Sequence, residues 1–330
     1  MRRHRIAVGI PLTVAALLAG ALSAGAAAAA PPPPPPPASF APQQAAKGFW
    51  TAERMRSATP LDLIQPAPGA LKAPSKGGKT TSIAPTPAPG APSSIARTDL
   101  GPTAFPQPGG PWTSGGAVVK TSGRVFFTMQ GRTASCSGNS VTSKNGSTVI
   151  TAGHCVKYQG GWHTNWVFVP GYDNGQAPYG QWSATKTLAT DQWAASENIN
   201  YDVGAAVVAP LNGKTLAETV GAQGLQFNGG YNKAMYAFGF PAAAPYNGSK
   251  LIYCSGNSSK DFLFSQDHSL GCNMTGGSSG GPWFTSFNEA TGTGLQASVN
   301  SFGYIFLPNR MFGPYFGPEA QALYDKAQSS

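Results

Sequence analysis

A serine framed by glycines and a histidine framed by small residues stand far apart in this chain of 330 residues. Ser279 lies in the stretch GGSSGGP at 276–282, and His154 lies in TAGHC at 151–155. A serine hydroxyl is a weak nucleophile near neutral pH, and it becomes reactive when a histidine takes its proton and a third group orients that histidine. The pair therefore indicates acyl-transfer chemistry, whereas a glycine-serine stretch by itself is equally typical of a surface turn.

His154 is the histidine with the most informative surroundings. It follows the β-branched run at 147–151, which predicts a strand that ends beside the imidazole. Of the other three histidines, His4 lies in the N-terminal leader, and His163 and His268 lie in polar stretches that we predict to be loops.

The order of these residues along the chain separates folds that share this chemistry. GSSGG at 277–281 also fits the nucleophile elbow of the α/β-hydrolases, but their histidine follows the serine, and no histidine follows Ser279. The subtilisin order would need an acid before His154, where the only aspartates, Asp62 and Asp99, lie in low-complexity sequence. The order that remains is His, Asp, Ser.

Asp202 is the preferred acid between the histidine and the serine. It opens the apolar run at 203–209, and an acid at the mouth of a buried strand can be held by hydrogen bonds, as the orientation of an imidazole requires. A turn or cap residue is the alternative interpretation, and Asp191 is the alternative acid. The other acidic residues in this interval are Asp173, Glu197, Glu218, Asp261 and Asp267.

The motifs TAGHC, YDVGAAVV and GGSSGGP, in this order, resemble the three triad motifs of the trypsin-like (chymotrypsin-fold) serine peptidases. The resemblance covers residues 110–325 and is closest to the bacterial secreted branch that includes the glutamyl endopeptidases. It implies that Ser279 is the nucleophile, His154 the general base and acid, and Asp202 the orienting carboxylate. It also implies an oxyanion hole built from the backbone N–H groups of Gly277 and Ser279.

The same resemblance implies where a peptide would bind. The segment 301–303 would pair with an extended peptide as an added strand, and the base of the primary pocket would lie at 273–274. That base has no aspartate for a Lys or Arg side chain, and an asparagine stands where glutamate-specific members often have a histidine. We therefore expect a neutral pocket for an apolar or medium-sized polar side chain. The expected substrate-binding residues are Asn273, Met274, Asn300, Ser301, Phe302 and Gly303.

Ser278 departs from a pattern common in animal members of the family. They carry an aspartate before the nucleophile, and a new N-terminal ammonium pairs with it after activation. A neutral serine cannot form that ion pair. We therefore expect activation to remove an inhibitory or chaperoning pro-segment.

The sequence before the catalytic motifs divides into two parts. Residues 1–30 have a basic start, an apolar core and an alanine run, which together predict a secretory signal peptide. Residues 31–109 are rich in proline and are expected to be extended or disordered, as an excised propeptide or a retained linker. Within them, Gly48–Trp50 and Leu61–Ile64 are apolar patches that could dock on the folded domain.

The charge follows the same division. Residues 1–104 hold ten Lys and Arg against three Asp and Glu, whereas residues 105–330 hold twelve against ten. A nucleic-acid-binding protein would need a basic face on its folded domain, so we expect no nucleic-acid partner. No stretch after the leader is long and apolar enough to span a bilayer, so we expect no stable membrane insertion once the leader is removed.

The remaining sequence predicts an all-β peptidase domain at 110–330. Short apolar runs recur between glycine and asparagine turns, and they favour a β-barrel or sandwich, with one short helix at 318–328. The resemblance adds the architecture of two packed six-stranded antiparallel barrels, at 110–215 and 216–330.

Four cysteines in an exported chain indicate two disulfides, for which three pairings exist. Local pairing, Cys136 with Cys155 and Cys254 with Cys272, would give each barrel one crosslink beside one catalytic residue. A zinc site is the competing interpretation, but the chain has no CxxC or HxxxH spacing. We expect no metal and no organic cofactor.

Together these observations predict a secreted, monomeric serine endopeptidase that acts on proteins or peptides through an acyl-enzyme. Two alternatives stay open. One is an inactive peptidase homologue that binds a partner through the cleft in which active members bind substrate. The other is an envelope-associated binding protein in which the proline-rich segment is the functional part.

Overall fold

The computed structural model describes residues 39–43, 46, 48–66, 77–90 and 105–330. The predicted signal peptide at 1–30 lies outside these ranges. The chain divides into two units, Met1–Pro36 and Pro37–Ser330, and every described residue belongs to the second.

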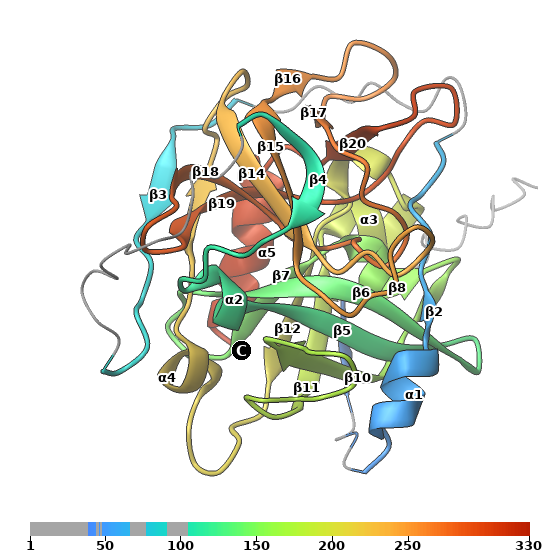
Figure 1. Ribbon diagram of the computed structural model, residues 1–330, viewed down its shortest axis with the longest axis vertical. Coiled ribbons are helices and arrows are strands. Elements are labelled where there is room, and N and C mark those ends of the chain that lie inside the picture. The colour runs from blue at the N-terminus through green and yellow to red at the C-terminus, as the bar shows by residue number, and fades with distance from the viewer. Residues whose placement is uncertain (1–38, 44–45, 47, 67–76, 91–104) are drawn as a thin grey trace, which may run out of the picture. The chain divides into compact units, whose positions relative to one another are not determined.

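The first half of the catalytic region is a closed antiparallel barrel (Figure 1). Six strands form the ring in the order β5, β6, β7, β12, β11, β10, and the pairing of β11 with β12 closes it. This confirms the six-stranded barrel expected for the first half. The strands are β5 (Ser122–Met129), β6 (Arg132–Val141), β7 (Thr148–Thr151), β10 (Thr164–Pro170), β11 (Trp182–Ala189) and β12 (Gly204–Val208).

The strands of the second half form two separate sheets, and β3 and β4, from the sequence before the first barrel, complete the edges of the larger one. The seven-stranded sheet has the order β3-β13-β19-β18-β14-β15-β4, and the three-stranded sheet has the order β16-β17-β20. An isolated bridge between Phe302 and Phe312 joins the chain after β19 to β20. The strands are β3 (Thr81–Ile83), β4 (Gln107–Pro111), β13 (Gly224–Phe227), β14 (Ala234–Gly239), β15 (Ile252–Asn257), β16 (Ser259–Lys260), β17 (His268–Gly271), β18 (Pro282–Asn288), β19 (Thr293–Val299) and β20 (Arg310–Gly313).

The described helices are short. The predicted C-terminal helix is confirmed as α5 (Pro318–Gln328), which begins with proline at its first turn and buries Ala320, Leu323, Tyr324 and Ala327 on one face. None of the described helices has the length and apolar character needed to cross a membrane. The others are α1 (Ala52–Ser57), α2 (Val118–Thr121), α3 (Asp191–Ser196) and α4 (Leu216–Val220).

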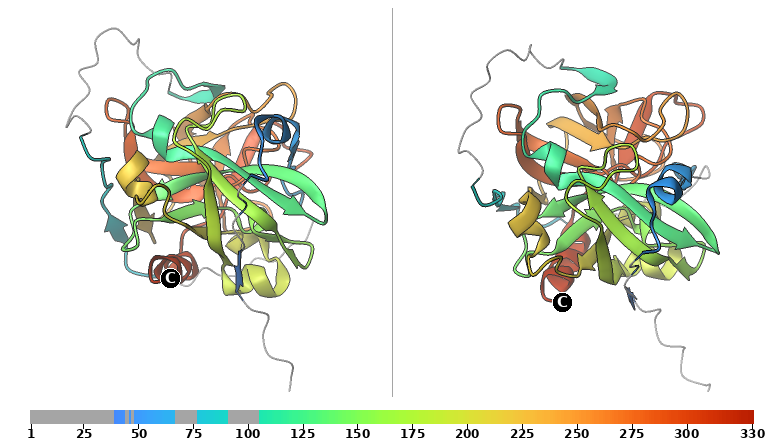
Figure 2. Two further views of the ribbon diagram at one scale, coloured as in Figure 1. Left: turned by 90° about the horizontal axis from the view of Figure 1, so that it is seen from below. Right: turned by 60° about the horizontal axis from the view of Figure 1, so that its bottom comes forward.

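The expectation that residues 31–109 are extended holds for three short strands in their described parts, but these parts are ordered and include a helix. Besides α1 and β3, they form β1 (Phe40–Pro42), which pairs with β11, and β2 (Thr59–Pro60), which pairs with β6. In both views of Figure 2, α1 lies beside the strands of the first barrel. Trp50 and Met55 are 2% and 1% exposed, and they belong to the same buried cluster as Phe126. A proline-rich segment has no core of its own, but it becomes ordered when its few apolar side chains enter the core of a neighbour.

Both disulfides have the local pairing. Cys136 is bonded to Cys155 and Cys254 to Cys272, with sequence separations of 19 and 18 residues. The first disulfide connects β6 to the turn that carries His154. The second connects β15 to the segment that leads toward Ser279.

Candidate active site

His154 is held by Asp202 at two points. The chain leaves β7 and makes a single 3-10 turn at Gly153–Cys155, which places the imidazole at the end of the strand, as the sequence predicts. Nδ1 of His154 lies 2.7 Å from Oδ2 of Asp202, and the backbone N–H of His154 donates to Oδ1 at 2.7 Å. Because a carboxylate oxygen can only accept, Nδ1 carries the proton and Nε2 presents its lone pair.

The structure places Asp202, and not Asp191, against the imidazole. Asp202 follows the 3-10 turn Ile199–Tyr201, just before β12, and is fully buried. The hydroxyl of Ser301 donates a third hydrogen bond to it, at 2.5 Å from Oδ2. Asp191 instead lies at the surface, where its carboxylate is 2.9 Å from Nζ of Lys326.

The loop that carries Ser279 packs closely against the strand that leads to His154. The carbonyl oxygen of Ser279 accepts a hydrogen bond from the backbone N–H of Ser137 at 2.7 Å. Gly280 has a φ of +80°, and a Cβ at this position would lie 2.1 Å from Oγ1 of Thr151. Only glycine fits here, because both the backbone conformation and the close approach exclude a side chain. This contact brings the nucleophile loop to the first barrel.

The two atoms that would exchange a proton are unpaired, and they are not hydrogen-bonded to each other. Nε2 of His154 and Oγ of Ser279 are both buried, and neither has a hydrogen bond to any described residue. Buried polar groups are nearly always paired, and the exceptions require an explanation. Both atoms, on the residues that the motifs single out as nucleophile and base, thus lack the hydrogen bond that would join them, a contact that is often long before substrate binds.

Three residues that sequence reasoning missed, or assigned otherwise, hold this arrangement together. Ser137 accepts from Phe240 N–H and donates to the carbonyl of Gly277, both at 2.9 Å. Asn300 was expected to contact substrate, but its amide nitrogen donates to Phe238 and Ser278 carbonyls at 2.8 and 3.0 Å, and its oxygen accepts from an indole. Its side chain therefore fixes the nucleophile loop. No local pattern marks either residue, since both roles depend on strands that are distant in sequence.

His163 is the third such residue. It lies outside regular secondary structure, as predicted, between β9 (Gly161–Trp162) and β10, and it is buried, with its ring stacked on Phe127 at 4.4 Å between centroids. Its Nε2 lies 2.9 Å from the carbonyl oxygen of His154, so this nitrogen carries the proton. Burial lowers the pKa of His163 to about 4. The prediction of a loop is wrong for His268, which begins strand β17; it is buried, and burial lowers its pKa to about 4.

The predicted oxyanion N–H of Gly277 has a partner from the N-terminal part of the chain. It donates to the carbonyl oxygen of Leu61 at 2.9 Å. The N–H therefore points to a position where a carbonyl oxygen can bind. Gly277 has a φ of +90°, a conformation that side chains rarely adopt.

The predicted pocket residues differ in their surroundings. Met274 is 3% exposed and belongs to an apolar cluster on which Leu63 packs. The amide oxygen of Asn273 accepts from the hydroxyl of Tyr246 at 2.7 Å. Phe302 stacks on Phe312 with 5.0 Å between ring centroids. Met274 therefore packs among apolar side chains.

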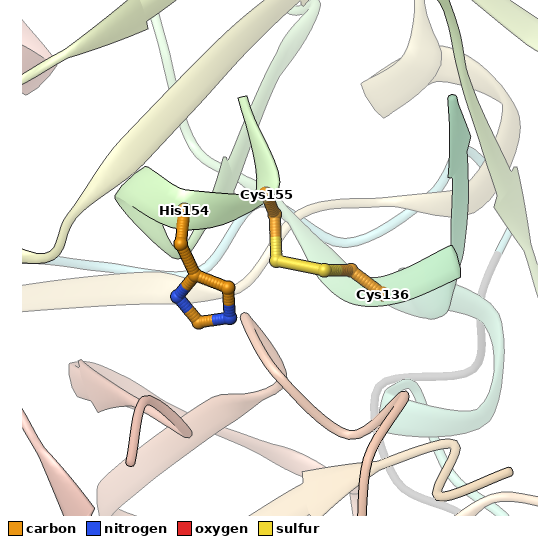
Figure 3. Close-up of side chains that lie close together, drawn as sticks. All are labelled: Cys136, His154 and Cys155. Carbon is orange, nitrogen blue, oxygen red and sulfur yellow. A yellow bond between two sulfur atoms is a disulfide. The ribbon is translucent and has the colours of Figure 1, made fainter. Parts of the chain in front are cut away.

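Cys136, His154 and Cys155 are the one group of described residues whose donor atoms are close enough together to suggest a metal site. Figure 3 shows the imidazole beside the bond that joins the two sulfur atoms. Zinc and related ions are bound by thiolates, and a disulfide offers none. This donor set therefore does not fit a metal ion.

Comparisons with known proteins show that the chain is similar to proteases. No protein-family model matches the chain. The chain is similar to the protease Anisep from Arthrobacter nicotinovorans, with 47% identity and a TM-score of 0.61 over 65% of this chain and 98% of that one. It is also similar to the thermostable serine protease AL20 from an extremophilic microorganism, with 42% identity and a TM-score of 0.61 over 65% and 99%. A Glu endopeptidase matches at 15% identity, with a TM-score of 0.53 over 67% and 97%, which shows a shared fold.

One curated relative is a protein named extracellular metalloprotease from Bacillus subtilis (strain 168). It is 37% identical over 109 residues, which are 33% of this chain and 32% of the relative. The chain therefore spans about a third of the length of that relative.

Proposed function

This chain belongs to the trypsin-like (chymotrypsin-fold) serine peptidases, and we propose that it is a secreted endopeptidase that cleaves peptide bonds through Ser279, His154 and Asp202. The family membership supports the reaction class. The roles of the individual residues rest on their geometry.

The observation that supports the proposal is the hydrogen bonding of the two ring nitrogens of His154. Asp202 holds Nδ1 at 2.7 Å, while Nε2 and the hydroxyl of Ser279 have no hydrogen bond to any described residue. A base oriented on one side and available on the other is what proton transfer from a serine requires.

In the proposed reaction, Oγ of Ser279 attacks a substrate carbonyl carbon while Nε2 of His154 takes the hydroxyl proton. The backbone N–H groups of Gly277 and Ser279 bind the oxygen that becomes negatively charged. His154 then gives its proton to the leaving amine, and an acyl-enzyme remains. Water, deprotonated by the same imidazole, hydrolyses it. Asp202 stays ionised and stabilises the imidazolium in both halves.

We propose that this chemistry uses no metal or organic cofactor. The support is the donor set beside His154, in which both sulfurs are bonded to each other. The word metalloprotease belongs to the name of a relative and is not carried over. A chelator should leave hydrolysis of a peptide substrate unchanged, and a fluorophosphonate should abolish it.

The substrate is proposed to be a protein or peptide with an apolar side chain before the scissile bond. The packing of Leu63 on the cluster that contains Met274 and Met311 supports this choice, because the cluster accepts an apolar side chain of leucine size. Digestion of a peptide library should give cleavage after Leu, Met or Phe. Cleavage confined to Lys, Arg or Glu would contradict the assignment. Secretion and a monomeric state are part of the same proposal.

The proposal is tested by labelling the active protein with a fluorophosphonate and locating the modified residue by peptide mass spectrometry. Ser279 should carry the label, and Ser279→Ala should lose both label and turnover. The matched control is Ser278→Ala, because the neighbouring hydroxyl donates to the carbonyl of Thr275 at 2.7 Å and faces no base. It should keep the label on Ser279. A folded parent protein that is never labelled would instead support the inactive-homologue alternative.

A further inference from the structure

Residues 59–64, here named the strap, run through the part of the molecule where a substrate would bind. Thr59 and Pro60 pair in parallel with Ala134 and Ser135 of β6. The backbone N–H of Leu61 then donates to the carbonyl of Ser135 at 2.9 Å. This end of the strap therefore adds to the first barrel, next to the disulfide at Cys136.

The middle of the strap lies on the nucleophile loop. The carbonyl of Leu61 occupies the N–H of Gly277, the predicted oxyanion donor, at 2.9 Å. Asp62 follows directly over Gly276, where an added Cβ would fall 2.9 Å from Oδ1 of Asp62. No substrate carbonyl can use the Gly277 donor while Leu61 holds it.

The far end of the strap pairs with the segment expected to align substrate. Ile64 forms a parallel bridge with Phe302, and its carbonyl accepts from the N–H of Gly303 at 3.2 Å. Between these points the side chain of Leu63 packs on the apolar cluster that contains Met274. The strap therefore lies where a substrate peptide would add a strand. Its Leu63 side chain also lies against the apolar cluster of the predicted pocket.

The burial of the site agrees with this arrangement. His154, Asp202 and Ser279 are all 0% exposed, although an endopeptidase must admit a polypeptide to the serine and the histidine. The strap is also tethered, since Trp50 is buried upstream and its indole N–H donates to the carbonyl of Asn165 at 2.7 Å. A tether of this kind keeps the local concentration of the strap high, so weak contacts suffice to occlude the site.

We propose that the strap is a built-in inhibitor that fills the substrate cleft of the uncut chain, and that activity requires its displacement. This inference rests on the proposed function, since it assigns the regulation of the same site. The strap is expected to stay intact, because Nε2 of His154 has no hydrogen-bond partner among the described residues, those of the strap included. A leaving amine must lie within reach of that nitrogen for the bond to break.

The test compares the rate of fluorophosphonate labelling in the uncut full chain. Leu63→Asp places a charge against the apolar cluster, so it should open the strap and raise the rate of labelling at Ser279 by about tenfold to a hundredfold. Phe40→Asp is the matched control, because it makes the same kind of change in β1, at a side chain that is 49% exposed. It should label as slowly as the parent. Intact mass must show that the labelled chains are uncut.

A second measurement uses a synthetic peptide of residues 58–66 added to the Leu63→Asp full chain. The peptide should inhibit hydrolysis of a chromogenic substrate competitively, raising KM with kcat unchanged, and should remain intact. The same peptide with aspartate in place of Leu63 should inhibit at least about tenfold more weakly.

Each outcome is decisive. If the uncut parent is labelled at Ser279 as fast as Leu63→Asp, the strap inference is wrong while the proposed function stands. If the peptide is hydrolysed, the strap is a substrate and its inhibitory role is overturned. If no variant is labelled at Ser279 although all are folded, the proposed function fails and the inference fails with it.

Discussion

The hydroxyl of Ser301 lies 2.5 Å from Oδ2 of Asp202, the same oxygen to which His154 donates through Nδ1. The three side chains come from the turn after β7, the segment just before β12 and the segment just after β19. Their meeting ties the chain beyond the second sheet to the imidazole on the first barrel, so the two halves of the protein jointly fix the orientation of the base.

Loss of this hydroxyl should weaken catalysis without removing it. A hydrogen bond to a buried charged group contributes about 1.5–3 kcal/mol, so Ser301→Ala should lower kcat by about tenfold to a hundredfold with little change in KM. Ser301→Thr, which keeps the hydroxyl, should recover most of the activity. Ser298→Ala is the control in β19, because that hydroxyl donates to Pro314 rather than to the triad. Equal losses in both alanine variants would mean that Ser301 acts only through folding.

Asp202→Asn should abolish most of the activity while the fold is retained. An amide can donate to the imidazole and favour the wrong tautomer, and in a well-studied triad of the same chemistry this exchange costs about 10⁴ in kcat. Asp191→Asn is the matched control, since Asp191 pairs with Lys326 at the surface. Steady-state kinetics on both variants decide between the two acids. A larger loss in Asp191→Asn would overturn the choice of Asp202.

Gly280→Ala should disrupt the nucleophile loop. Its Cβ would lie 2.1 Å from Oγ1 of Thr151 and 2.5 Å from the carbonyl oxygen of Ser137, so the loop must move away from the first barrel. The control is Gly213→Ala, which has a similar φ of +75° but no atom within 4 Å of the added carbon. Gly213→Ala should lose about 1 kcal/mol of stability and keep its activity. Gly280→Ala should lose both fluorophosphonate labelling at Ser279 and turnover of substrate. Full turnover in Gly280→Ala would show that this close approach is dispensable.

Protonation of His163 should lower the free energy of unfolding in acid. Its pKa is about 4 in the folded protein against an ordinary value near 6.5, so the unfolded chain binds the proton first as the pH falls. The free energy of unfolding should therefore be unaffected by this group above pH 6.5 and should decrease by about 3 kcal/mol between pH 6.5 and 4.

The measurement is urea unfolding of the parent and of His163→Gln across this pH range, both with Ser279→Ala to prevent self-digestion. His268, whose pKa is also lowered, and Asp267, whose pKa is raised by burial and by Asp261 and Asp202, titrate in both proteins, so the difference isolates His163. That difference should change by about 3 kcal/mol. Parallel curves would contradict the prediction.

Removal of the disulfide between Cys254 and Cys272 should destabilise the protein by about 3 kcal/mol, the value expected for a closed loop of this length. Double alanine substitution of these residues in the Ser279→Ala background, followed by urea unfolding, measures the loss. The same change at Cys136 and Cys155 should cost a similar free energy and should also reduce turnover in the otherwise unaltered enzyme, because Cys155 adjoins His154. A stability unchanged by either pair would contradict the estimate.

Several features of the molecule follow from the sequence because they depend on neighbours along the chain. The β-branched run before His154 forms a strand, the proline at 318 begins a helix, and cysteines 18 or 19 residues apart form disulfides. Chain order by itself also separates the His-Asp-Ser arrangement from two unrelated folds. The catalytic roles of the three residues remain predictions that the variants above test.

The contacts that complete the site could not be predicted in this way. The link through Ser137, the hold of Asn300 on the nucleophile loop and the path of the strap all join residues that are far apart in sequence. Such contacts depend on the register of the strands and on which side chains the closed barrel leaves room for. Local sequence can specify a strand or a turn, but only the packing of the whole chain decides which distant groups come within hydrogen-bond distance of one another.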